Sequence, residues 1–396
     1  MAKTRAQQRD RRSPRLTAAE RKQQLAATAA QWFYRHGFHG VALADVANDV
    51  GVTAPAVYRH FHNKTGLLAG AIESGLDVAE AAFNATPDEP LDDTLFSLAG
   101  AAIDRRDVWV LLQREARHLD AERRAAVQGR FDEFVAKFIT RIRHARPDCD
   151  RGQLSVLATA VLAIMSSASL SRSPLPREEY QYVLAAAAAA AARAELPPPS
   201  DDEPVRRLPD QADPPSRREQ LLESAIALFH EHGYAGVSLD DIGDAVGMAG
   251  PSIYHHFATK SDLLVAAFTR AARSLATQGA AGDQQALDEL VRRYIQVGVG
   301  QRHLFGVYVT EAINLPVECR RAVIAELTAN VEEWSAALRV RRPNVPANTR
   351  LALVYAARGI VNDIVRLGRL HTRPQIETEL DILVHAVLDV NLPEQP

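Results

Sequence analysis

The sequence predicts an all-α protein that contains two copies of one helical unit. The stretch 51–64 recurs at 247–260, an offset of 196 residues in a chain of 396. Apolar residues recur at three- and four-residue steps through most of the chain, as in amphipathic helices. Capping residues and glycines bound these segments at matching places in both halves. Together these observations indicate a duplicated helical fold.

The repeat extends well beyond the recurring motif. Residues 21–68 align without a gap to residues 217–264 and share about 20 of 48 positions. The same offset relates Glu115 to Glu311 and Arg146 to Arg342. This agreement exceeds what unrelated helices would give, so we interpret the chain as a tandem duplication.

Each copy begins with a predicted helix-turn-helix head. A helix, a second helix over 43–50, a tight glycine turn and a third helix over 55–61 follow one another in the first copy, and the second copy repeats this order. Proline in the first turn of the third helix costs no hydrogen bond. The predicted capping and turn residues are Thr17, Glu20, Gly37, Gly51, Thr53 and Asn63 in the first copy, and Ser216, Glu219, Gly233 and Gly247 in the second.

Further helices are predicted after each head, and a linker with seven prolines over 196–215 separates the copies. The predicted helices are 108–119, 125–143, 153–171 and 178–195 in the first copy and 304–314, 320–339, 349–369 and 375–392 in the second. The predicted domains are a basic arm (1–16), a head (17–70), a regulatory domain (71–195), the linker (196–215), a second head (216–266) and a second regulatory domain (267–392).

Composition favours a soluble, cytoplasmic protein. The chain is 47% hydrophobic and 24% charged, with a net charge of −3. The longest bland stretch, 185–192, is polyalanine and too weakly apolar for a membrane span, and no apolar segment follows the basic N-terminus as in a signal peptide. Two distant cysteines indicate reduced thiols. Eight basic residues against two acidic ones over 1–24 predict either a solvated tail or an arm that reaches DNA.

The heads resemble those of the TetR family of transcriptional regulators, most specifically in Val57-Tyr58-Arg59-His60-Phe61-His62-Asn63-Lys64 and its second copy. The resemblance implies a tandem family member that binds double-stranded DNA through its third helices. Tyrosine and histidine would reach phosphates and base edges, and lysine would meet a phosphate. The implied DNA-facing residues are Thr53, Pro55, Ala56, Tyr58, Arg59, His60 and Lys64 in the first head, and Ser238, Pro251, Ser252, Tyr254, His255, His256 and Lys260 in the second, with Ala249 at the position of Thr53.

Differences between the heads predict an asymmetric operator. Arg59 can fork onto a guanine, whereas His255 at the matching position cannot make that bidentate pair. Ser238 can cap its helix and bind a phosphate, whereas Ala42 lacks the hydroxyl. The two heads should therefore prefer different half-sites.

The resemblance also implies that helices of each regulatory domain enclose an effector pocket and that effector binding releases DNA. The mostly apolar candidates favour a hydrophobic effector with one polar end, although core packing explains many of them. Glu115 and Glu311 are the least easily explained as core. The candidates are Trp109, Leu112, Glu115, His118, Phe131 and Phe134 in the first copy and Phe305, Tyr308, Glu311, Asn314, Trp334 and Asn362 in the second.

The family's dimers pair through a four-helix bundle, which the last two helices of each copy would here build within one chain. That chain would be an internal pseudo-dimer, with further homodimerisation left open. An enzyme is disfavoured because no phosphate loop or nucleophile elbow occurs. No cofactor is expected, and no metal, since the nearby histidines lack a familiar ligand spacing. The remaining alternative is a homodimer or adaptor in which one head binds DNA and the other binds protein.

Overall fold

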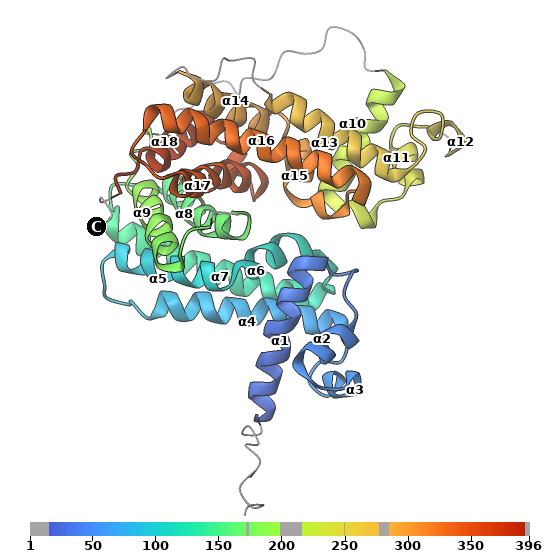
Figure 1. The fold of residues 1–396 in the computed structure, drawn as a ribbon, viewed down its shortest axis with the longest axis horizontal. Helices are drawn as coiled ribbons and strands as arrows, with labels where there is room; N and C mark the ends of the chain where they lie inside the picture. The colour runs from blue at the N-terminus through green and yellow to red at the C-terminus, as the bar shows by residue number, and fades with distance from the viewer. Residues whose placement is uncertain (1–15, 172–173, 199–215, 249, 277–284, 393–396) are drawn as a thin grey trace, which may run out of the picture. The chain divides into compact units, whose positions relative to one another are not determined.

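The computed structural model describes residues 16–171, 174–198, 216–248, 250–276 and 285–392, and all regular structure in these ranges is helical (Figure 1). The predicted all-α class is thus confirmed. Packing divides the chain into two compact units. The smaller unit comprises Met1–Asp77 and Val110–Gly129, and the larger unit comprises Val78–Trp109 and Arg130–Pro396. Of the predicted arm and linker, residues 1–15 and 199–215 lie outside the described ranges.

The first head lies in the smaller unit. Thr17 and Glu20 form the predicted capping box, and the helix ends at Gly37, which has a φ of 70°. The amide of Asn63 caps the fourth helix by accepting from the Gly66 backbone N–H at 2.7 Å. The elements are α1 (Ala18–His36), α2 (Leu43–Val50), α3 (Ala54–Tyr58), α4 (Lys64–Asn84), η1 (Leu111–Glu115) and η2 (Ala116–His118).

Four local predictions need correction. The third helix ends at Tyr58 instead of residue 61, and the side chain of Thr53 precedes it without making a capping hydrogen bond. The predicted helix over 108–119 is not one α-helix, because it passes from α into a π turn and then a 3-10 turn. In the second copy Ser216 caps its helix, but Glu219 instead pairs with Arg270.

The second head belongs to the larger unit and repeats the first. Ser238 and Asp241 form a complete capping box at the start of its second helix. The elements of this head are α10 (Arg217–His232), η4 (Tyr234–Gly236), α11 (Leu239–Ala245), α12 (Gly250–Ile253) and α13 (Lys260–Leu275).

Helices of both copies build the rest of the larger unit. Two of them, α5 (Leu91–Asp104) and α14 (Ala286–Gly300), were absent from the sequence prediction and occupy matching positions in the repeat. The others are α6 (Arg106–Val110), α7 (Ala121–Ala145), α8 (Arg151–Ser166), η3 (Ser167–Ser169), α9 (Arg177–Ala192), α15 (Arg302–Thr310), η5 (Ala312–Asn314), α16 (Val317–Arg341), α17 (Ala347–Arg366), η6 (Leu370–Thr372) and α18 (Ile376–Leu388).

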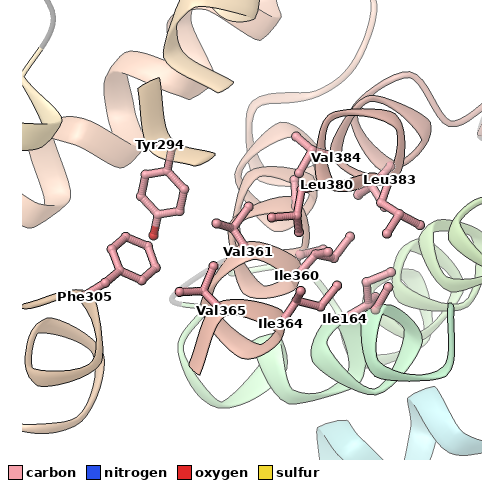
Figure 2. Packing of buried hydrophobic residues seen from close by; sticks show 14 of the residues in the cluster. Ile164, Tyr294, Phe305, Ile360, Val361, Ile364, Val365, Leu380, Leu383 and Val384 are labelled. Atoms are coloured by element: carbon pink, nitrogen blue, oxygen red, sulfur yellow. The ribbon is translucent and has the colours of Figure 1, made fainter. Parts of the chain in front are cut away.

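The larger unit is centred on a four-helix bundle in which α8 and α9 of the first copy pack against α17 and α18 of the second (Figure 1). Ile164 of α8 lies against the α17 side chains Ile360 and Ile364 (Figure 2). A Cβ at Gly359 would lie 3.0 Å from the carbonyl oxygen of Ala163, its own equivalent in the first copy. Equivalent residues therefore meet at the crossing, as at a two-fold interface.

The residues Arg151–Ser169 form the one helical segment, within the described ranges, that is long and apolar enough to cross a membrane. Its mean hydropathy is 1.4, and 78% of the apolar window is buried inside the structure. The most membrane-like segment is thus α8 with η3, not the polyalanine helix singled out from the sequence. Its burial identifies it as the core helix of the bundle.

Candidate nucleic-acid interface and ligand cavity

The first head presents its predicted DNA-facing residues on one side of α3. Val57 and Phe61 are buried and anchor the helix, whereas the Tyr58 ring remains 51% exposed. The Tyr58 ring is therefore available to a partner. Of the other predicted residues, Thr53, Pro55 and Arg59 are exposed and Ala56 and His60 are half-buried.

The second head shows the same pattern of exposure. Ile253 and Phe257 anchor α12 in the core, and the Tyr254 ring is 56% exposed. Ser252 and His255 are exposed and His256 is half-buried; Arg59 and His60 match the last two, whereas Ala56, the counterpart of Ser252, is half-buried. Pro251 lies in α12 with its side chain outside the described part of the structure, and Ala249 lies outside it altogether. The two heads therefore offer similar surfaces with different side chains at the reading positions.

The two predicted phosphate lysines contact their own heads. Lys260 donates to the backbone carbonyls of Tyr234 and Val237 at 2.8 and 2.7 Å and lies 4.3 Å from the centre of the Tyr234 ring. Lys64 lies 4.7 Å from the centre of the Phe38 ring. Partial burial lowers the pKa of both ammonium groups. Each lysine thus contacts the turn that follows the first helix of its head, a structural role that the sequence did not predict.

The start of the second helix differs between the heads as predicted. Ser238 accepts from the Asp241 backbone N–H at 3.1 Å, and its own N–H donates to the Asp241 carboxylate at 2.7 Å. In the first head Asp45 accepts from the Ala42 N–H at 3.0 Å, but no hydroxyl is present. Only the second head has a side-chain hydroxyl here that a phosphate can share.

Among the first-copy pocket candidates, Glu115 and His118 instead join η1 and η2 to the first head. The Glu115 carboxylate is 2% exposed, pairs with Arg114 and accepts from the Phe38 backbone N–H at 2.8 Å. Arg114 donates to the carbonyls of Phe33 and Tyr34 near the end of α1 at 3.2 and 3.1 Å. The His118 ring stacks on Phe38, with centroids 4.9 Å apart. Leu112 lies half-buried in the same turn.

The other first-copy candidates form an aromatic core in the larger unit. Trp109 meets Phe131 edge-on at 5.4 Å, and Phe134 meets Phe83 at 5.8 Å between centroids. The structure therefore divides the six candidates between its two compact units. Edge-on contacts at this spacing are ordinary aromatic packing.

The second-copy candidates gather around a partly open cavity of about 200 Å³ in the larger unit. Tyr308 and Asn362 line it, and Trp334 and Phe305 pack behind it against the Tyr294 ring, at 5.5 and 5.1 Å between centroids. Figure 2 shows Tyr294 and Phe305 beside Val361 and Val365 of α17. Glu311, which follows the last residue of α15, is fully buried and accepts from the Asn314 amide at 2.6 Å, and it does not line the cavity.

Arg358 of α17 also lines the cavity and was not among the predicted residues. Its side chain is 5% exposed and lines the cavity together with Tyr294 and Asn362. The sequence could have indicated this residue, because Arg358 lies on the same helical face as Val354 and Val361, where an apolar residue is expected. The first copy has such a residue, Leu162, at the matching position.

Within the described ranges, no group of three or more His, Cys, Asp or Glu residues is placed to hold a metal ion. Cys149 and Cys319 are both free thiols.

The two three-helix heads, each with an anchored third helix and an exposed tyrosine, define a helix-turn-helix DNA-binding architecture. Comparison with known proteins gives the family. The family described as "Bacterial regulatory proteins, tetR family" matches residues 25–71 and 221–267. This chain therefore contains two copies, in tandem, of the TetR-family head.

Individual relatives match over short stretches. The transcriptional repressor KstR2 of Mycobacterium tuberculosis is 45% identical over 49 residues, which cover 12% of this chain and 24% of KstR2. The repressor AcnR of Corynebacterium diphtheriae is 40% identical over 50 residues, or 13% of this chain and 26% of AcnR. The chain thus spans about a quarter of the length of these relatives. A solved TetR-family regulator from Bordetella parapertussis is 23% identical, with a TM-score of 0.39, and the match covers 45% of this chain and 97% of that one.

Proposed function

We propose that this chain is a cytoplasmic transcriptional repressor that reads an operator with two unlike half-sites, using both heads of one chain. The observation that carries the proposal is the matched exposure of Tyr58 and Tyr254 on third helices that are otherwise anchored in the core. An exposed tyrosine at the same position of both heads is expected if both heads bind DNA, because its ring and hydroxyl are then available for contact with the duplex. Repression follows the activity of the matched relatives KstR2 and AcnR.

Unlike half-sites follow from the residues at the reading positions. Arg59 carries a planar fork that suits a guanine, whereas His255 can offer a single donor or acceptor at a time. Ser238 adds a hydroxyl near the backbone that Ala42 lacks. The operator should therefore contain a guanine at a position in the first half-site that the second half-site does not require.

One chain would supply both heads as an internal pseudo-dimer. In the bundle, α8 and α9 pack on α17 and α18, and Gly359 lies against Ala163 where α17 crosses α8. This packing supports the proposed arrangement because family dimers pair through such a bundle. Two heads that bind successive major grooves on one face of the duplex lie one helical turn apart, about 34 to 36 Å. An effector held by the second regulatory domain would change this separation and release the DNA.

The test is selection of bound DNA by the purified full-length protein, followed by mass measurement of the complex on the shortest bound duplex. We expect an asymmetric site occupied by one chain. A palindromic site that holds two chains would refute the pseudo-dimer and favour a homodimer in which each chain commits one head.

Two matched variants test the heads separately. Tyr58→Ala and Tyr254→Ala should each weaken operator binding by about tenfold or more, since each removes one contact set from one half-site. Both rings are exposed, so neither change should alter the free energy of unfolding by more than about 0.5 kcal/mol. If only one variant weakens binding, the other head serves a protein partner, and the reading by two heads is wrong.

A further inference from the structure

The cavity of the second copy contains a buried positive charge that the described residues do not neutralise. The Arg358 side chain is 5% exposed, and no carboxylate of the described chain lies within salt-bridge distance of its guanidinium. Its hydrogen-bond partners are neutral: the Asn330 amide oxygen at 2.9 Å and the Tyr308 hydroxyl at 3.1 Å. The Tyr294 hydroxyl accepts a further hydrogen bond from this side chain. A guanidinium has five N–H donors, so two remain for another partner.

Neighbouring aromatic rings stabilise this positive charge but do not neutralise it. The guanidinium carbon lies 4.5 Å from the centre of the Tyr294 ring and 5.9 Å from that of Trp334, within cation–π range. Burial raises the pKa of Tyr294 to about 12, so its hydroxyl stays protonated and adds no negative charge. The Glu333 carboxylate accepts from the Asn330 amide at 3.4 Å.

A buried charge without a counter-ion is strongly unfavourable, and natural proteins keep one where a partner supplies the opposite charge. Arg358 lines the cavity of about 200 Å³, as do the apolar side chains of Ile324, Leu327 and Val331. An arginine fork pairs best with a carboxylate, through two parallel hydrogen bonds. The cavity thus combines a carboxylate-binding group at one wall with apolar contacts at another.

We propose that the second copy binds a small apolar carboxylic acid, with its carboxylate on Arg358 and its hydrocarbon body against α16. This inference rests on the proposed effector control, for which it names the effector's chemical class and the copy that binds it. The volume suits a ligand of medium chain length more than a large polycyclic one, since drug-sized pockets begin at about 300 Å³.

The first copy contributes one wall and no second site of this kind. Leu170, which follows η3 of the first copy, lines the cavity of the second. The equivalents of Tyr294, Tyr308 and Arg358 in the first copy are Leu98, Leu112 and Leu162. We therefore assign one carboxylate site per chain, closed partly by the other copy across the bundle.

The experiment is titration calorimetry of the full-length protein, without DNA, in buffer free of chloride so that no inorganic anion competes. The probes are the acids from hexanoate to decanoate and, for each, the alcohol of equal length. We expect the best acid to bind at least about tenfold more tightly than its alcohol, with a stoichiometry of one. Equal affinity of acid and alcohol, or binding by none of the acids, would overturn the proposal.

Variants locate the site. Arg358→Leu, which restores the residue of the first copy, should reduce the acid-to-alcohol preference to about one. Arg358→Lys keeps the charge without the fork and should retain part of the preference, which covers the case in which the leucine variant does not fold. Leu170→Ala should weaken acid and alcohol alike and leave their ratio unchanged. Leu162→Met is the matched control in the first copy, and a loss of preference there would contradict the assignment.

The outcome separates this inference from the proposed function. If the protein binds octanoate through Arg358 but no operator is found, the repressor proposal fails and the carboxylate site stands. If the protein binds an operator but shows no preference for acids over alcohols, the carboxylate site is wrong and the repressor proposal stands.

Discussion

The two copies share one scaffold but differ inside it. Arg146 donates to the carbonyls of Ala192 and Ala194 at the end of α9, and Arg342 donates to those of Leu388 and Val390 at the end of α18, each at 3.0 Å or less. Each arginine thus caps the last helix of its own copy. Contacts that hold the helices of a copy together have been kept at an offset of 196 residues.

The α17 helix, by contrast, carries charged side chains at positions that are uncharged in the first copy. Arg358 and Asp363 are buried and the Arg366 side chain is 8% exposed, where the first copy has Leu162, Ser167 and Leu170. Charges inside a bundle add little net stability and are costly to leave unpaired. The interiors of the two copies therefore differ in charge, whereas the capping contacts are the same in both.

The largest effect should come from breaking the ion pair on α17. Asp363 pairs with Arg366 at 3.0 Å, both nearly buried, and accepts from the Ser166 hydroxyl of α8 at 3.1 Å. Asp363→Ala leaves Arg366 buried without its carboxylate and should lower the free energy of unfolding by about 3–5 kcal/mol. Urea unfolding followed by circular dichroism measures this loss.

The matched change in the first copy is Ser167→Ala. Ser167 is buried and donates to the Ile164 carbonyl at 2.6 Å within its own helix. Ser167→Ala removes one hydrogen bond between neutral groups and should lower the free energy of unfolding by about 1 kcal/mol or less. Equal losses in the two variants would show that the copies do not differ energetically at this position.

Much of the fold could be predicted from periodicity and caps, because local hydrogen bonds dictate them. Thr17 and Ser238 cap their helices as expected. The division into compact units follows instead from packing across the bundle, which no local pattern encodes. Likewise the head contacts of Glu115 depend on a partner 77 positions away in the sequence. Arg358 was detectable as a charge on an apolar face, but its lack of a counter-ion required coordinates.

An intermediate effect is expected at Glu115, which joins η1 to the first head. Glu115→Ala removes the acceptor of the Phe38 N–H and the partner of Arg114, at a cost of about 1–3 kcal/mol. The loss should appear as faster amide hydrogen exchange in α1, measured by mass spectrometry.

The second head provides the internal reference for Glu115→Ala. Its helix α10 should exchange at the unmodified rate, because the change touches only the smaller unit. Faster exchange in both heads would mean that Glu115 stabilises the whole chain and not the first head alone.

The smallest effect should be a pH-dependent one at His385, which α18 has where α9 has Ala189. Hydrogen bonding to Asp381, opposed by burial and reinforced by Asp288, raises the pKa of His385 from 6.5 to about 9. A pKa raised by folding stabilises the protein fully below the unfolded value and ceases to do so as the pH rises through the folded value. The contribution should therefore be complete below about pH 6.5 and lost between about pH 6.5 and 9.

His385→Ala should cost about 1 kcal/mol near pH 6 and almost nothing above pH 9, after allowance for solvent screening of a partly exposed group. Urea unfolding at the two pH values measures the difference. Asp92→Asn is the matched control, because Asp92 pairs with Arg193 in the first copy at the position equivalent to Asp288. With no histidine in that pair, its loss should be the same at both pH values. If His385→Ala lowers the free energy of unfolding equally at both pH values, the protonated histidine does not stabilise the second copy, and the prediction is wrong.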